Sequence, residues 1–248
     1  MSAAKKRLWG ALFIVILIVL WQVIAMAVNK SYMLPQPIDV LAHIWENRVE
    51  IFTVHLPATM QVVGLGLLFS VIAGFVFALL MDCDARIEKA VYPLLTASQT
   101  IPTMCIAPVL VLWLGYSVQM RVFVVVLVNF FSVAVNVFDG LKSTNQGMTE
   151  LMETYGADRW QRFFLLRLPT AMPDFFTALK IAVPWSMVGA AVAEWLGAPA
   201  GLGMYSRNCM TELDAAGLLA PLIVLTVIAL ILNGVLSVIE KKVFSWKA

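Results

Sequence analysis

Few residues inside the hydrophobic parts of this chain can do chemistry, and the most conspicuous is Glu194. It ends a long run of residues that carry no charge. A carboxylate within a membrane costs on the order of 3 kcal/mol, so Glu194 must face protein, water or a partner. Asn129 and Asn136 stand seven residues apart in another apolar run, a spacing that puts both amides on one face of a helix. These groups can bind a polar solute or hold helices together.

Two roles are open for each of these polar groups. The two asparagines either bridge neighbouring helices or meet a polar solute in a translocation path. Glu194 either lines that path or lies at the outer end of a helix, where it would hold the glycine-rich loop of residues 197–203. Neither role is catalytic.

No catalytic or metal-binding group is predicted. The chain has no glycine-rich phosphate loop and no pair of carboxylates within a hydrophobic run, so it has no motif for ATP hydrolysis. Cys83, Cys105 and Cys209 form neither a disulfide framework nor a metal-ligand pattern. His43 and His55 are twelve residues apart and add no ligand cluster. We therefore expect no catalytic residue, no metal and no cofactor in this chain, which must take its energy from another protein.

A polar, basic segment at residues 150–169 interrupts the hydrophobic sequence. It predicts two short helices, 150–155 and 159–168, which are joined at Gly156 because glycine adopts backbone angles that other residues resist. Asp158, followed three residues later by Gln161, fits a capping box at the start of the second helix. Pro169 is expected to end it. The segment should therefore form an elbow of two helices.

The second helix of this elbow is predicted to be amphipathic. One apolar face is formed by residues that recur at helical spacing, Trp160, Phe163, Phe164 and Leu168, whereas Arg159, Arg162 and Asp158 fall largely elsewhere. Such a helix could lie on the lipid surface with its basic residues among the headgroups. It could instead dock on a partner protein, as aromatic residues often do at interfaces.

Composition places the rest of the chain in a membrane. Of the 248 residues, 61% are hydrophobic and 13% are charged, and the mean hydropathy is +0.89. A net charge of +2 is too small to indicate nucleic acid binding. Runs of about 20 apolar residues can cross a bilayer as helices. We expect one all-α integral membrane domain over residues 1–248, with six transmembrane helices near residues 8–28, 56–81, 90–114, 120–139, 175–197 and 215–239.

The distribution of basic residues predicts the orientation. With the N-terminus inside, only Lys30, Arg48, Arg121 and Arg207 among the lysines and arginines fall outside. Basic residues favour the cytoplasmic side, so both termini and the elbow are predicted to be cytoplasmic. The first apolar run is longer than the core of a usual signal peptide and lacks a clear cleavage site, so we expect it to be retained.

The predicted third span is too long and too broken for one straight helix. It contains Pro102 and Pro108 and continues to Trp113. Proline inside a span frees backbone carbonyls, which neighbouring helices or a water-filled pathway must then satisfy. The segment is therefore either a kinked packing helix or a helix that lines a pathway.

Three parts of the sequence resemble one transporter family. Glu150, Gly156 and the Leu168-Pro169 pair resemble the EAA signature of the membrane subunits of ABC importers, although Leu151 and Met152 replace two small residues of that signature. The segment from Ile101-Pro102 to Leu114-Gly115 resembles a span of the nitrate, sulfonate, taurine and thiamine-precursor importers. Ala193-Glu194 followed by Gly201-Leu202-Gly203 resembles the same family.

The resemblance implies a permease subunit with the type I importer fold in a bacterial inner membrane. It implies that the elbow is a coupling helix that docks in a groove of a cytoplasmic ATPase, which would use ATP and magnesium. The coupling residues would be Glu150, Gly156, Ala157, Trp160, Phe163, Leu168 and Pro169. It also implies a second permease copy in a homodimer, surrounding lipid, and an external solute-binding protein that delivers the substrate.

The substrate is predicted less directly. The sequence Glu194-Trp195-Leu196-Gly197 resembles the thiamine-precursor branch of the family more than its sulfonate, taurine or nitrate branches. We expect the solute to pass a cavity lined by Trp113, Asn129, Asn136 and Trp185, with Pro102, Pro108 and Glu194 also on the pathway. A secondary transporter that works without ATP is the alternative, and it predicts inverted repeats. The sequence offers only a brief likeness between residues 56–60 and 168–172.

Overall fold

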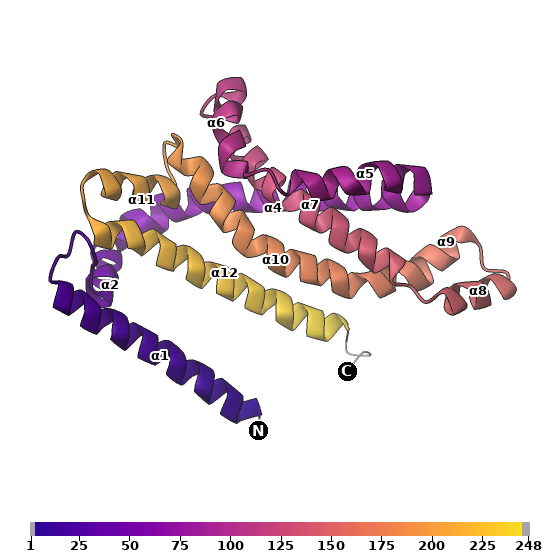
Figure 1. Ribbon diagram of the computed structural model, residues 1–248, viewed down its shortest axis with the longest axis horizontal. Coiled ribbons are helices and arrows are strands. Elements are labelled where there is room, and N and C mark those ends of the chain that lie inside the picture. Colours follow the sequence, from indigo (N-terminus) through magenta and orange to yellow (C-terminus); the bar gives the residue numbers. More distant parts are fainter. Residues whose placement is uncertain (1–2, 245–248) are drawn as a thin grey trace.

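The structure is a computed structural model that describes residues 3–244, and the side chains of all of these except 3–8, 11, 103 and 104. Every regular element in the described part is helical (Figure 1). The expectation of an all-α protein is therefore confirmed.

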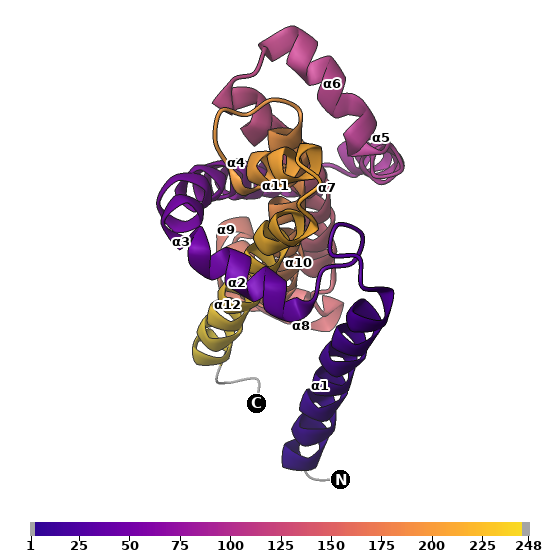
Figure 2. The same ribbon diagram turned by 90° about the vertical axis from the view of Figure 1, so that its left-hand side faces the viewer.

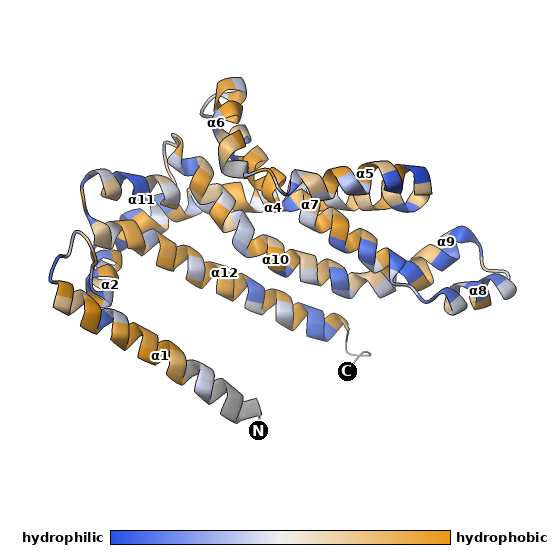
Figure 3. Cartoon of the chain, in the orientation of Figure 1, coloured by the Kyte–Doolittle hydropathy of each residue, from blue (hydrophilic) through white to orange (hydrophobic). Residues whose placement is uncertain are grey.

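Four helical segments are long and apolar enough to cross a membrane. They contain α4 (Leu56–Cys83), α7 (Val118–Lys142), α10 (Leu168–Trp195) and α12 (Ala215–Val243). Two shorter apolar stretches, Leu12–Val28 of α1 (Ala3–Val28) and Cys105–Leu114 of α6 (Thr103–Leu114), accompany them. Hydrophobic residues predominate along these helices (Figure 3), and many of their side chains are exposed. Six spans and cytoplasmic termini stay predictions.

The centre of the bundle is formed by α4, α7 and α10, which pack through small residues. A Cβ atom on Gly66 would lie 2.3 Å from a methyl carbon of Val125, and one on Gly74 would lie 2.7 Å from Val133. Glycine therefore lets α4 approach α7 closely. Buried valines, alanines and Phe138 fill the space among the three helices.

The predicted break in the third span is present. The helix α5 (Ala85–Ser98) ends before residues 99–102, and Pro102 has an extended conformation with ψ 111° at the start of α6. Because a proline has no N–H and fixes φ, it suits the first residues of a helix better than the interior. The helix α6 therefore begins in a new direction and projects away from the bundle in two perpendicular views (Figures 1 and 2).

Two π-helical segments correct the expectation that Pro169 ends a helix. The segment η2 (Phe163–Arg167) continues directly into α10, so the backbone stays helical through Pro169. The segment η1 (Ile51–His55), which follows α3 (Arg48–Glu50), leads into α4 through Pro57 in the same way. A wider turn relieves the clash between a proline ring and the carbonyl four residues earlier. The likeness between residues 56–60 and 168–172 thus has a shared local structure.

Several shorter helices gather at the two ends of the long ones. The helices α2 (Pro37–Glu46) and α11 (Leu202–Thr211) lie with the start of α12 at one end (Figure 2). The helices α8 (Gln146–Thr154) and α9 (Arg159–Arg162) lie toward the other end, and α12 runs toward that end from its start beside α2 and α11 (Figure 1). This arrangement is compatible with the predicted orientation.

Candidate functional site

The elbow begins where α8 ends, and its turn depends on Gly156. This glycine has φ +79°, a value that disfavours residues with a Cβ atom, although no neighbouring atom would contact such a Cβ. The next helix starts with the predicted capping box: the Gln161 N–H donates to Asp158 Oδ1 over 2.7 Å, and the Asp158 N–H donates to Gln161 Oε1 over 2.9 Å. Both predictions for this turn are confirmed.

Two ion pairs hold the elbow in place. Arg162 pairs with Glu153 and connects the two short helices across the turn. Arg167 pairs with Asp82 at the end of α4, and its Nη1 atom donates to Asp82 Oδ2 over 2.8 Å while Nη2 contacts Oδ1. A bidentate arginine–carboxylate pair fixes orientation as well as distance. The base of the elbow is therefore braced against the bundle.

The outer side of the elbow carries exposed apolar side chains. Trp160 is 70% exposed, and its ring stacks on Phe164 with centroids 6.0 Å apart. We define the elbow patch as Met148, Leu151, Tyr155, Trp160, Phe164 and Leu165, all of which are exposed. Phe163 is instead partly buried against the bundle, so the predicted common face of Trp160 and Phe163 is divided between two sides.

The other predicted coupling residues support the elbow rather than its patch. Glu150 is exposed and accepts a hydrogen bond from Gln146 within α8. Ala157 lies in the turn and its N–H donates to the Met152 carbonyl over 2.9 Å. Leu168 and Pro169 belong to the first turn of α10. Sequence reasoning treated Leu151 only as a departure from the EAA signature and missed its exposure.

The elbow is continuous with the helix that reaches the middle of the protein. Residues 159–195 form one helical segment of 37 residues. At 1.5 Å per residue, Trp185 lies roughly 38 Å along this segment from Trp160. A displacement of α9 can therefore reach residues far from the elbow without passing through a flexible loop.

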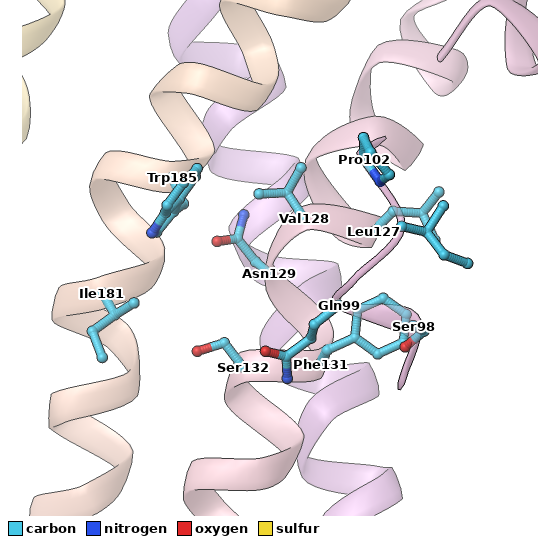
Figure 4. A pocket seen from close by; sticks show the side chains of 11 residues that line it. Ser98, Gln99, Pro102, Leu127, Val128, Asn129, Phe131, Ser132, Ile181 and Trp185 are labelled. Carbon is cyan, nitrogen blue, oxygen red and sulfur yellow. The ribbon is translucent and has the colours of Figure 1, made fainter. Parts of the chain in front are cut away.

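A cavity of about 380 Å³ lies where this segment passes α7 and the break between α5 and α6. Its wall combines hydrogen-bonding and apolar side chains, with Trp185 and Ile181 of α10 opposite the loop residues (Figure 4). The lining residues are Ser98, Gln99, Ile101, Pro102, Leu127, Val128, Asn129, Phe131, Ser132, Ile181 and Trp185. None of these side chains carries a charge.

Asn129 connects the cavity to the contact between α7 and α10. Its Nδ2 atom donates to the Val125 carbonyl over 2.9 Å and to Ser186 Oγ over 3.0 Å. This bond supports the helix-bridging role that was one of the two alternatives. The amide oxygen has no hydrogen bond from the described residues, so it stays available as an acceptor. Asn129 can therefore fill both roles.

The structure brings together only some of the predicted pathway residues. Pro102, Asn129 and Trp185 line the cavity, whereas Pro108 and Trp113 lie on the projecting α6, where Trp113 is 76% exposed. Asn136 lies outside the lining set and donates to the Ser132 carbonyl over 2.7 Å. Sequence reasoning missed Ser98, Gln99 and Ser132, although their polar side chains beside apolar runs were a usable signal.

Glu194 is fully buried at the far end of α10 and organises a separate network. Its Oε2 atom accepts hydrogen bonds from Thr59 Oγ1 over 3.1 Å and from the Gly203 N–H over 2.8 Å. Thr59 also accepts from the Leu202 N–H over 2.8 Å. A Cβ atom on Gly201 would lie 2.3 Å from the Glu194 carboxyl carbon. This geometry favours the structural alternative, in which Glu194 holds the loop of residues 197–203.

Comparison with known proteins finds a matching family and similar individual proteins. Residues 66–245 match the family described as "Binding-protein-dependent transport system inner membrane component". The chain is 42% identical to the formylaminopyrimidine transport permease protein ThiX of Halalkalibacterium halodurans, over 100% of this chain and 99% of that protein. It is 26% identical to the taurine transport system permease protein TauC of Escherichia coli, over 94% of this chain and 86% of that protein.

A solved structure is similar in fold. The crystal structure of an amino acid ABC transporter with histidines contains a chain that superposes with a TM-score of 0.68 at 16% sequence identity. The superposition covers 82% of this chain and 97% of that chain. The likeness extends over most of the helical bundle.

Proposed function

Because the chain belongs to the family of binding-protein-dependent transport system inner membrane components, and is thus the permease of an ABC importer, we propose that it carries a small uncharged heterocycle, a pyrimidine precursor of thiamine. An external solute-binding protein delivers this substrate, and separate ATPase subunits hydrolyse ATP. The observation that carries the proposal is the cavity between α7, α10 and the α5–α6 break, whose lining has no charged side chain.

The chemistry of this cavity suits a neutral ring better than an anion. Gln99, Asn129 and Ser132 offer hydrogen bonds in several directions, and Trp185 offers an aromatic surface. Burial of a sulfonate or nitrate ion without a cationic partner costs several kcal/mol or more. A volume of 380 Å³ is near the lower end for ligand cavities and fits a single ring. These properties favour the pyrimidine over the sulfonate, taurine or nitrate alternatives.

The energy for transport enters at the elbow patch. Exposed Trp160 and Phe164 form an aromatic pair of the kind that anchors protein interfaces, and they dock in a groove of the ATPase subunit. Closure of the ATPases on ATP displaces α9, and the continuous segment 159–195 moves the cavity wall at Ile181 and Trp185 relative to residues 99–102. This coupling distinguishes the importer from a secondary transporter.

A second copy of the permease completes the pathway. The helix α6 projects from the bundle with Leu112 84% exposed and Trp113 76% exposed, and lipid or the second copy covers these side chains. The homodimer lies in a bacterial inner membrane, with six spans in each copy and both termini in the cytoplasm. The elbow then faces the cytoplasm, where ATP is available.

Two measurements test the proposal. Trp160→Asp should prevent co-purification of the ATPase, and Trp45→Asp is the matched control because Trp45 is 69% exposed at the opposite end. In proteoliposomes that contain the complete importer, ATP should drive uptake of formylaminopyrimidine, and excess taurine should not compete. Uptake without ATP, retention of the ATPase by the Trp160 variant, or preferential taurine uptake would overturn the corresponding part of the proposal.

A further inference from the structure

Three potential metal ligands converge at the end of the bundle opposite the elbow. His43 lies on α2, Cys209 on α11, and Asp214 at the N-cap of α12 (Figure 2). One ligand atom from each residue lies within 4.8 Å of the other two. Their separation in the sequence explains why spacing predicted no metal site. The chain folds them into one cluster from three helices.

The orientation of each side chain suits a metal ligand. His43 Nδ1 lies 3.2 Å from Asp214 Oδ2, which is close to the separation of neighbouring ligands around a tetrahedral ion. Asp214 caps α12 with its other oxygen, which accepts the Gly217 N–H over 3.0 Å. Histidine ligands commonly bind a second group through their other nitrogen, and His43 Nε2 lies 2.7 Å from the Tyr205 hydroxyl.

Gly217 lies tightly against these ligands, where a residue with a side chain would not fit. A Cβ atom built on it would lie 2.5 Å from Asp214 Oδ2, 2.6 Å from Cys209 Sγ and 2.8 Å from the Cε1 atom of His43. The absence of a side chain at residue 217 therefore lets the three ligand side chains gather against the first turn of α12. Zinc lies about 2.3 Å from sulfur and about 2.0–2.2 Å from nitrogen and oxygen, so small movements of the side chains would suffice.

We propose that His43 Nδ1, Cys209 Sγ and Asp214 Oδ2 bind a zinc ion between them, next to the first turn of α12. Imidazole, thiolate and carboxylate together suit zinc, and a water or another group takes the fourth position. Cys209 would bind the ion as a thiolate, so binding releases the thiol proton to solvent.

The ion would join elements that surround the Glu194 network. His43 belongs to α2, whereas Cys209 belongs to the helix that begins beside Gly203, a hydrogen-bond donor to Glu194. Zinc would therefore clamp α2 to the α11–α12 corner and stabilise the loop that Glu194 holds. This role is structural and does not depend on the identity of the transported solute.

Metal content of the full-length protein tests the site. After removal of metal and addition of Zn²⁺, the purified chain in nanodiscs should retain one ion, and this ion should raise the temperature of unfolding. Replacement by Co²⁺ should produce a sulfur-to-cobalt absorption band. Cys209→Ser should abolish the band and His43→Gln should abolish retention, whereas Cys83→Ser, a change of an exposed cysteine, should alter neither.

Two further variants keep the test decisive if a ligand variant folds poorly. Tyr205→Phe keeps all three ligands but removes the hydroxyl group beside His43 Nε2. It should weaken zinc affinity roughly 10- to 100-fold, as is usual when the hydrogen-bond partner of a metal ligand is removed. Gly217→Ala should push the three ligand side chains apart and prevent binding. Failure of the wild-type chain to bind zinc or cobalt, or unchanged binding in the Cys209 and His43 variants, would overturn the proposal.

Discussion

Replacement of Gly156 by valine should uncouple ATP hydrolysis from transport. Gly156 has φ +79° at the turn between α8 and α9. A β-branched residue resists this conformation because its side chain crowds the backbone. The variant should therefore shift the elbow toward other conformations without changing the helices on either side.

The size of the effect follows from backbone strain alone. No heavy atom would lie within 4 Å of a Cβ atom at this position, so steric overlap with neighbouring residues adds nothing. Strain of about 1–2 kcal/mol for a left-handed residue corresponds to roughly a 5- to 30-fold loss of the native turn. Uptake per ATP hydrolysed should fall by at least about 5-fold if transport needs that turn.

Proteoliposomes that contain the complete importer provide the assay, with uptake and ATP hydrolysis measured in the same sample. Gly156→Asn is the matched control because asparagine tolerates left-handed angles, and it should keep most of the coupling. Equal uptake per ATP in the valine variant and the wild type would refute the idea that the geometry of this turn transmits force.

Three other changes test the contacts around this pathway. A double-mutant cycle of Arg167→Met and Asp82→Asn should give a coupling energy of about 1.5–3 kcal/mol in thermal unfolding, as for hydrogen bonds between charged groups. Additive effects of the two changes would contradict a stabilising role for the Arg167–Asp82 ion pair. Glu194→Ala should lower the free energy of unfolding by about 1–3 kcal/mol because the buried Gly203 N–H loses its acceptor, whereas Glu194→Gln should lower it less. Equal unfolding temperatures for the alanine variant and the wild type would exclude this role. Gly66→Ala should cost about 1–3 kcal/mol through overlap with Val125, and Val125→Ala should restore part of the loss; no rescue would argue against this contact.

The elbow shows which local features a sequence can predict. The capping box of Asp158 and Gln161 depends on residues three apart, and the turn at Gly156 depends on one residue, so both were predictable. The prediction that the helix ends at Pro169 was wrong because a π-helical turn lets the helical backbone continue through this residue. Phe163 packs against the bundle instead of sharing the outer face with Trp160, a division that the apolar pattern alone did not predict.

The cavity shows where sequence reasoning reaches its limit. Periodicity placed Asn129 and Asn136 on one face of α7, but it did not indicate which turn of that face meets the break after α5. Trp113 was expected at the cavity, yet the change of direction at Pro102 carries α6 away from the bundle. Which residues meet across helices depends on crossing angles and helix breaks, and these have no short sequence signal.

Packing at the centre limits how the permease can change conformation. A Cβ atom on Gly74 would lie 3.0 Å from the Ala134 nitrogen, and one on Gly140 would lie 3.2 Å from the Ala171 Cα, so α4 meets α7 and α7 meets α10 at backbone distance. Packed interfaces of this kind have few intermediate arrangements, and sliding would force backbone overlap. We therefore expect α4, α7 and α10 to move together as one body when the elbow is displaced. The cavity would then open where its wall is made of other elements, at residues 99–102 and at the surface that α6 presents to a second copy.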